Sequence, residues 1–528
     1  MKSESGYVKR PLALIGLTFF LTVWSLTTFG YSLIAIILPL LFSAVGLTMI
    51  LKYKKRAIIL VMTFVTFMSA CLCFFVADRN LKNASDFCGK DRIIKGSVYD
   101  YYEGFDGIVC EIKADSIDGI ETDFKIKVTF PHLKPDVIVK YENILFTADL
   151  TKFDDYKDSY NRNNISEKIY LSGKSEINQF EKIRNQHHTP MYYINLLREK
   201  ICNAVIKFLP NDYGGLLLSF VLGEKSYLSK QVIQNFKICG ISHLMAVSGL
   251  HVYTWSSYLY TFLTNYLTRR KSSLIAICFT LFFMALTGFS PSVVRAGIMM
   301  ICVYAGHIFF KQSDSLNSLG LAALILLIFN PFASTNISFM LSFSAALGLA
   351  AFGERISKTT QKAEEKFKNK IVKKLSELIT SSISTCFVAT VFTLPIMVFY
   401  LGNFSLLNFA GNLVAVNISM YIMIIGGIGA ILSAIIGLLG QPFLFVAGFL
   451  SKILLKAINF LAQFDFLYFN VDNSYVKTLI VVFAISLIGL YIYKPEIYKN
   501  KKVTAFIFIN LFVISFVVEY IIKCLGVI

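Results

Sequence analysis

Apolar runs long enough to cross a membrane recur along almost the whole chain, and they constrain its fold more than any other feature. A spanning helix needs about 20 mainly apolar residues, and such runs begin near Leu12 and continue almost to Ile528. Only 16% of the residues are charged, whereas soluble globular proteins carry about 25%. The first run lacks a small-residue cleavage site and is followed at once by a second, so we expect it to stay as an anchor. The pattern predicts a polytopic α-helical membrane protein with about 11–13 spans.

The net charge of +18 is distributed unevenly. Residues 78–189 contain 17 Lys and Arg against 20 Asp and Glu, a net of −3, while the remainder contains 34 against 13, a net of +21. The basic excess therefore lies beside the apolar runs, where the positive-inside rule places Lys and Arg in short cytoplasmic loops. We interpret the bulk charge as a consequence of membrane topology, which makes it a weak indication of nucleic-acid binding.

The basic loops also predict sidedness. Lys2, Lys9 and Arg10 precede the first apolar run, so we expect a cytoplasmic N-terminus. Residues 1–77 read as a three-helix membrane segment, in which the third span follows the basic stretch 52–56. That span would deliver the next segment to the outer side of the membrane.

Residues 78–189 are polar and carry five stretches of alternating hydrophobicity, a pattern typical of β-strands. Five strands in about 90 residues suit a small Greek-key barrel of the OB type, and another five-stranded sandwich is the alternative. We therefore predict an extracytoplasmic OB-like domain whose strands cover 93–102, 107–116, 123–130, 143–152 and 168–177.

This domain contains candidate DNA contacts. OB folds bind single-stranded DNA with a basic groove and stacking aromatic side chains. Tyr99, Tyr101, Lys125 and Lys127 offer both chemistries. The alternative is that the aromatic residues belong to the core of a slightly acidic domain.

Cys88 and Cys110 are the only cysteines in residues 78–189. An extracytoplasmic location permits oxidation. We predict a disulfide between them, with two free thiols as the alternative.

The chain beyond residue 189 returns to the membrane. Residues 190–211 place apolar residues at helical spacing beside Arg198, Lys200 and Lys207, which predicts an amphipathic helix on the membrane surface. Residues 212–528 then form the main polytopic domain, with a short segment at 213–223 that could be re-entrant. The expected spans lie near 241–267, 272–288, 292–310, 316–329, 336–352, 376–400, 407–436, 440–462, 475–493 and 503–522.

Ionisable and hydroxyl side chains stand inside two of these apolar segments. His243, Ser248 and His251 would share one face of a helix at 100° per residue, and Arg295 follows the outer turn at 290–291 by about one turn. Ionisable groups within a span are costly and usually face a bundle interior or a water-filled cavity. We interpret the four as a polar cluster on a translocation path, and interhelical hydrogen bonding that locks the bundle is the alternative.

The chain carries no Walker A motif, no GxSxG elbow and no HxHxDH run. His307 follows Arg295 by about 18 Å along a helix, which argues against a three-His metal site with His243 and His251. We therefore expect no enzymatic activity, no cofactor and no metal.

Several segments resemble the ComEC family of competence proteins, the inner-membrane channels for DNA uptake. The specific segments are HLMAVSGLHV at 243–252 and GFSPSVVRA at 288–296, and the supporting ones include LGEKSYLS and TLPIMVFYLGNFSLLNFAGNLVAVNI. Together they cover roughly 215–425. Two departures are the absence of the metallo-β-lactamase-like domain that ends many members, and Asn417 in place of a frequent Pro.

The resemblance implies a channel in the bacterial plasma membrane that moves single-stranded DNA into the cytoplasm during natural transformation. It also implies a separate nuclease, an outer DNA receptor and a cytoplasmic motor as partners. The alternatives are a transporter of another anionic polymer or a small solute, and a membrane scaffold without transport activity.

Overall fold

The computed structural model describes residues 10–33, 35, 37, 39, 56–104, 106–131, 138–153, 159–175, 181–182, 189–364, 370–471 and 477. The chain divides into two compact units. Unit 1 comprises residues 1–200 and 256–339, and unit 2 comprises residues 201–255 and 340–528.

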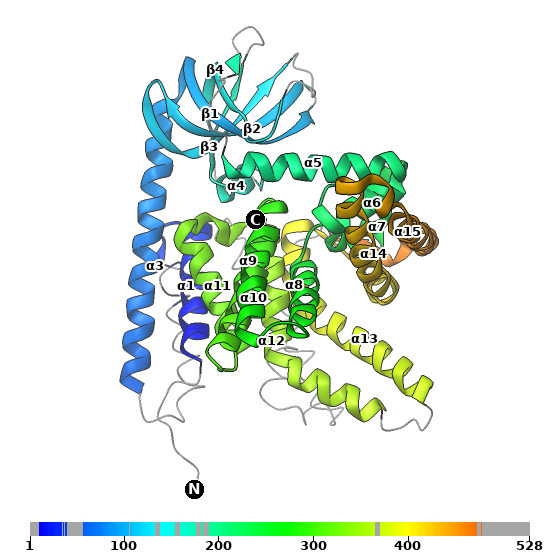
Figure 1. The fold of residues 1–528 in the computed structure, drawn as a ribbon. Coiled ribbons are helices and arrows are strands. Elements are labelled where there is room, and N and C mark those ends of the chain that lie inside the picture. Colours follow the sequence, from blue (N-terminus) through cyan, green and yellow to red (C-terminus); the bar gives the residue numbers. More distant parts are fainter. Residues whose placement is uncertain are drawn as a thin grey trace. The chain divides into compact units, whose positions relative to one another are not determined.

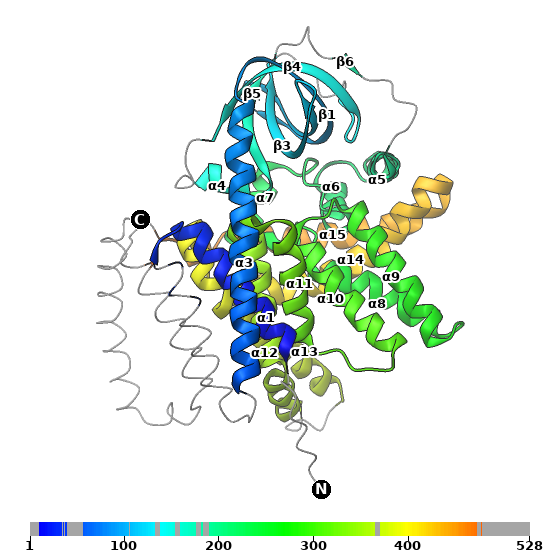
Figure 2. The ribbon, with the colours of Figure 1, turned by 90° about the vertical axis from the view of Figure 1, so that its left-hand side faces the viewer.

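Unit 1 begins with two helices that run beside a third from later in the chain (Figures 1 and 2). α1 (Pro11–Phe29) starts on a proline, which suits a first turn because the N–H groups there have no acceptor within the helix. It packs closely against α11 (Ser315–Phe329): a Cβ on Gly16 would overlap the backbone of Gly320, and a Cβ on Gly320 would overlap the backbone of Leu12. α3 (Arg56–Ala84) also packs on α1, and it continues about seven residues beyond the expected span to reach the β domain.

The other helices of unit 1 form a continuous series. They are α9 (Arg269–Leu286), α10 (Pro291–Ile308), α11 and the 3₁₀ turn η5 (Pro331–Thr335). α9 and α10 pack against each other, and α10 packs on α11. Three helices are shared between the units: α5 (Pro190–Phe208), α8 (Gly249–Thr264) and α12 (Ile337–Glu364).

The β domain of unit 1 is built from five main strands, each paired with two others. These are β1 (Gly89–Gly104), β2 (Gly107–Ile117), β3 (Ile120–Phe130), β4 (Asn143–Lys152) and β5 (Ile169–Lys174). The pairings run β1–β2–β3–β5–β4 and return from β4 to β1, with β3–β5 parallel and the rest antiparallel. A two-residue strand, β6 (Glu181–Lys182), extends β4.

Along each strand, apolar side chains that point into the β domain alternate with polar side chains that point outward. The interior of the β domain is therefore apolar. Ile94, Ile112, Ile126 and Ile144 are fully buried in one core. Phe332 of η5 joins this core and packs edge-on against Tyr170, so the β domain and the helices of unit 1 share one hydrophobic cluster.

Two thiols expected to pair do not do so. Neither Cys88 nor Cys110 takes part in a disulfide bond. Cys110 is opposite Tyr101 on β1, whereas Cys88 lies just before Gly89 at the other end of that strand. At about 3.3 Å per residue, twelve strand residues separate the two far beyond the roughly 7 Å Cα limit of a disulfide. The predicted disulfide is therefore wrong.

Unit 2 holds the remaining helices. They are the second half of α5 (Pro190–Phe208), α6 (Asn211–Leu222), α7 (Lys230–Ile238), η4 (Ser242–Leu244), α13 (Lys370–Ile396), the π-turn Met397–Leu401, α14 (Asn408–Ile436), η7 (Gly437–Gly440) and α15 (Gln441–Leu461). β7 (Asn403–Ser405) pairs with β8 (Tyr468–Asn470) after the short turn η8 (Asp465–Leu467). The centre of this unit is the α14–α15 hairpin, on which α6 packs.

The helices confirm a membrane protein. Among the described residues, five helical stretches are long and apolar enough to cross a bilayer, at 11–29, 61–87, 291–308, 379–401 and 408–461. Two shorter apolar helices cover 315–329 and 337–353. The total of 11–13 spans stays a prediction, since the expected spans 475–493 and 503–522 lie outside the described residues.

One expected span is interrupted. The sequence predicts a continuous helix over 241–267, but the chain forms η4, then an irregular stretch at 245–248, and only then α8. His243, Ser248 and His251 therefore do not share the face of one regular helix.

Candidate functional site

Ser248 and His251 close the N-terminus of α8. The backbone N–H of Ser248 donates to His251 Nδ1 at 3.1 Å, and Ser248 Oγ lies 3.0 Å from the same nitrogen. The N–H groups of His251 and Val252 in turn donate to the Ser248 carbonyl oxygen. The bond from the Ser248 N–H to the side chain three residues later is one half of a capping box, with His in the place of the usual Glu or Gln. Because a backbone N–H can only donate, Nδ1 accepts, and the neutral ring carries its proton on Nε2.

His243 lies in η4 and is hydrogen-bonded to the side chain of Asn412 on α14. Asn412 Nδ2 donates to the Asn408 carbonyl oxygen at 2.8 Å, and Asn408 Nδ2 donates to Thr390 Oγ1 of α13 at 2.8 Å. A chain of polar groups thus runs from His243 through two asparagines into the apolar interior of unit 2.

Two glycines allow the segment before η4 to approach α14 closely. Gly240 has φ +69°, a conformation that L side chains rarely adopt, and its Cβ position lies 3.0 Å from the Asn408 side chain. A Cβ on Gly411 would lie 3.0 Å from the Cys239 carbonyl oxygen. Ser405 Oγ adds a bond of 2.6 Å to the Ile238 carbonyl oxygen. The segment before η4 is therefore packed backbone-to-helix on the start of α14.

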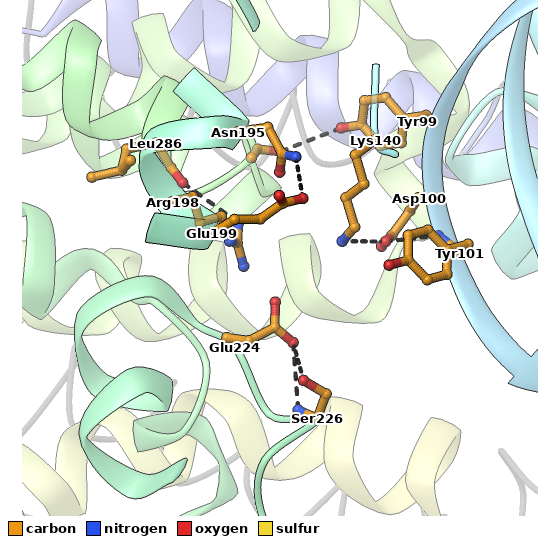
Figure 3. A network of polar contacts seen from close by, with 11 residues as sticks. Tyr99, Asp100, Tyr101, Lys140, Asn195, Arg198, Glu199, Glu224, Ser226 and Leu286 are labelled. Atoms are coloured by element: carbon orange, nitrogen blue, oxygen red, sulfur yellow. Dashed lines mark hydrogen bonds and ion pairs between the residues drawn. The ribbon is translucent and has the colours of Figure 1, made fainter. Parts of the chain in front are cut away.

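The LGEKSYLS segment lies beside the irregular stretch. Gly223 ends α6 in the left-handed conformation, and a Cβ there would lie 2.9 Å from Val247. Just beyond it, Glu224 Oε1 accepts from the hydroxyl of Ser226 at 2.9 Å (Figure 3). The two segments singled out in the sequence around Gly223 and Ser248 thus meet in unit 2.

Arg295 belongs to unit 1, within the first two turns of α10. Its side chain is buried, with Nη1 3.6 Å from Met299 Sδ one turn further along. Its burial among helices agrees with either interpretation, a path lining or a bundle lock. A cavity shared with His243 and His251 joins residues of two units and stays a prediction.

The aromatic and lysine side chains of the β domain contact each other. Lys125 Nζ lies 3.4 Å from the centre of the Tyr99 ring, a cation–π contact. Lys127 is buried and donates to Asn164 Oδ1 of α4 (Ser159–Ser166) at 3.4 Å. Tyr101, the fourth candidate DNA contact, has the ammonium of Lys140 5.7 Å from its ring. These contacts lie within the domain, and DNA contact by the four side chains stays a prediction.

Burial shifts the pKa values of Glu111 and Lys125 in the β domain. Glu111 stands opposite Lys127 in the β2–β3 register, and burial raises the pKa of its carboxyl while the Lys125 ammonium opposes that shift. Burial lowers the pKa of Lys125, and Glu111 opposes it. The two groups reduce each other's cost of leaving water.

The β domain is hydrogen-bonded to two turns of the helical part of unit 1. The Tyr99 hydroxyl donates to the Gly288 carbonyl oxygen at 3.3 Å, and Arg198 Nη1 donates to the Leu286 carbonyl oxygen at 3.4 Å (Figure 3). On η5, Asn330 Nδ2 donates to the Ser166 carbonyl oxygen at 2.7 Å. Both loops therefore fix the domain in unit 1.

Sequence reasoning missed Asn408 and Asn412. Their spacing of four residues inside an apolar run was the available signal, since polar side chains there must find partners. Within the described ranges, no group of three His, Cys, Asp or Glu side chains is placed to hold a metal ion.

Comparison with known proteins adds the following. The model of the family described as Competence protein matches residues 220–496. ComE operon protein 3 of Bacillus subtilis (strain 168) is 26% identical over 246 residues, which are 46% of this chain and 29% of that protein. An uncharacterized protein of Aquifex aeolicus (strain VF5) is 33% identical over 132 residues, 25% of this chain and 31% of that protein. The matched regions span less than a third of either relative. No solved structure matches.

Proposed function

Because the chain belongs to the competence protein family, we propose that it is a membrane channel that carries single-stranded DNA into the cytoplasm during natural transformation. The relative from Bacillus subtilis is named for a competence operon, which supports a role in DNA uptake. The membrane helices supply the setting for such a channel.

The observation that carries the proposal is the broken helix at 245–248, inside the matched region. Irregular backbone at membrane depth is tolerated only where it is buried in protein or lines a water-filled cavity. Here it is accompanied by His243, Ser248 and His251, and by the asparagines of α14. We propose that this polar region lies on the path of the DNA strand, and that Arg295 attracts its phosphates through a bidentate guanidinium.

We also propose that the β domain is an OB-type barrel on the outer side of the plasma membrane, with the N-terminus in the cytoplasm. The ring of pairings β1–β2–β3–β5–β4–β1 supports the barrel. The basic residues before α1 and around 52–56 support the sidedness. The contacts of Tyr99 and Asn330 would then fix the domain at the outer end of the helices.

In this proposal, other chains degrade the second DNA strand, capture the DNA and supply the energy for transport. We propose a separate nuclease, an outer DNA receptor and a cytoplasmic motor as partners, and no catalytic role for this chain.

Deletion of the gene in a competent host tests the proposal. Uptake of labelled DNA should fall to background and return when the full chain is supplied on a plasmid. Unchanged uptake in the deletion strain contradicts the channel and leaves a transporter of another substrate, or a scaffold, in its place.

A further inference from the structure

Two lysines stand on the exposed face of membrane helix α15, Lys452 near its centre and Lys456 one turn closer to its end. Lys452 and Lys456 are one turn apart, and both side chains are exposed. α15 has 21 residues, which puts Lys452 roughly 14–16 Å from either end at 1.5 Å per residue. A lysine side chain snorkels to the membrane surface only near a helix end.

Packing on α14 gives the depth independently. The helices are antiparallel, since the Cβ position of Gly429 lies 3.0 Å from Leu444 N, and that of Gly426 lies 3.0 Å from Ala447 Cβ. Continuing this register puts Lys452 level with about residue 421, near the centre of α14. α14 has 29 residues and none is charged, as expected of a full span. Both estimates therefore place Lys452 at mid-membrane.

The same face carries aromatic rings. Phe445, Phe449 and Phe460 are 68%, 59% and 59% exposed. At 100° per residue they fall with both lysines inside an arc of about 80°. The opposite face is buried and mainly apolar, with Leu444, Ala447, Leu454 and Ile458 fully buried. The exposed face is thus distinct in chemistry from the packing face.

In the part of the chain that the structure describes, neither Lys452 nor Lys456 forms an ion pair. A charged group at the bilayer centre is costly in lipid, and such groups mark ion and substrate pathways. The charge of Lys452 at this depth therefore requires water or a polyanion. Proteins bind single-stranded nucleic acid with surfaces on which positive charges alternate with exposed aromatic rings. The charges contact phosphates and the rings stack on bases.

We propose that this face of α15 lines the translocation path and binds single-stranded DNA. Lys452 and Lys456 contact phosphates, and the three phenylalanines stack on bases as the strand passes. This inference rests on the proposed function and adds to it the surface along which the strand moves.

Neutral and charge-conserving variants of the full chain test the proposal in the complemented deletion strain. K452Q/K456Q should lower labelled DNA uptake at least tenfold. K452R/K456R keeps both charges and should stay within about twofold of the wild type. The matched control is K271Q/K311Q, which removes two exposed lysines from loop and helix-end positions of unit 1 and should change nothing.

Wild-type uptake by K452Q/K456Q overturns this inference and leaves the proposed channel standing. A wild-type chain that restores no uptake removes the proposed function and the inference together. The two failures are therefore distinguishable.

A second measurement does not depend on uptake. Lys452→Cys and Phe64→Cys each place a thiol at an exposed position, the second on the apolar face of α3, where Phe64 is 61% exposed. A cationic, membrane-impermeant thiosulfonate should modify the cysteine at 452 at least tenfold more than the one at 64, as measured by mass spectrometry of the two peptides. Equal protection means that the lysines face lipid, which overturns the proposal.

Discussion

The phenol of Tyr99 donates a hydrogen bond to the carbonyl oxygen of Gly288, which lies 189 residues further along the chain. This contact joins strand β1 to the turn between α9 and α10. Because Arg198 holds the neighbouring carbonyl of Leu286, the turn that precedes Arg295 is fixed from two sides by the β domain and α5.

Tyr99→Phe removes only the hydroxyl of this junction. We expect a loss of about 1 kcal/mol in local stability, the ordinary net worth of a hydrogen bond. Hydrogen exchange of the amides at 286–290 should become faster by about fivefold. Tyr102→Phe is the control, since its ring is 44% exposed; equal exchange in both variants contradicts the junction.

His251 is expected to act first as a helix cap. His251→Leu removes the acceptor for the Ser248 N–H and should destabilise the start of α8 by about 1 kcal/mol. His251→Gln supplies the side chain that capping boxes normally use and should keep most of that stability. Exchange of amides 249–252 measures the difference, and a glutamine variant as labile as the leucine variant would show that capping is not the role of the ring.

Variants of Arg295 distinguish a role in the DNA path from a role in helix packing. Arg295→Lys keeps one charge but loses the bidentate fork, so DNA uptake should fall severalfold, and Arg295→Ala should abolish it. Membrane levels of both variants should match the wild type, as shown by immunoblotting of membrane fractions. Failure of both variants to accumulate would make Arg295 a structural residue of α10.

The β domain should lose stability as the pH rises from acid to neutral. Burial raises the pKa of Glu111 above its ordinary 4.5, so its contribution is present below 4.5 and is lost as the pH rises through the folded pKa. Asp118 has a lowered pKa because it accepts the Ile93 N–H, and its contribution changes only below 3.8. Glu111→Gln should therefore flatten the fall above pH 4.5.

Thermal unfolding of the purified full chain between pH 4.5 and 7 measures this effect. Asp115→Asn provides the control, because Asp115 is an exposed carboxylate on the same strand. A slope that is unchanged by Glu111→Gln would contradict the assignment to that carboxyl.

Much of the β domain could be predicted because its strands alternate in hydrophobicity. β4 covers Asn143–Lys152, the range that the alternation predicts. β1 begins four residues early because its polar start pairs with β4. Helix α4 could not be predicted, since its sequence SYNRNNIS has no apolar period. It is held by tertiary contacts, including the bond from Asn330 to Ser166.

The candidate site was harder to predict for a similar reason. An apolar run over 241–267 predicts one helix, yet the run contains its own start signal, Ser248 with His251 three residues later. Lys452 and Lys456 were visible in the sequence as charges within an apolar run. Their significance depends on which face of α15 is packed, and only the structure supplies that.

Cross-linking of the DNA strand during its passage tests the central claim most directly. A photo-crosslinking amino acid in place of Phe449 should become covalently attached to labelled single-stranded DNA in competent cells during uptake. The same amino acid in place of Phe64, which has nearly the same exposed fraction, should not. Cross-linking at 64 but not at 449, or at neither position while uptake proceeds, would contradict a path along α15.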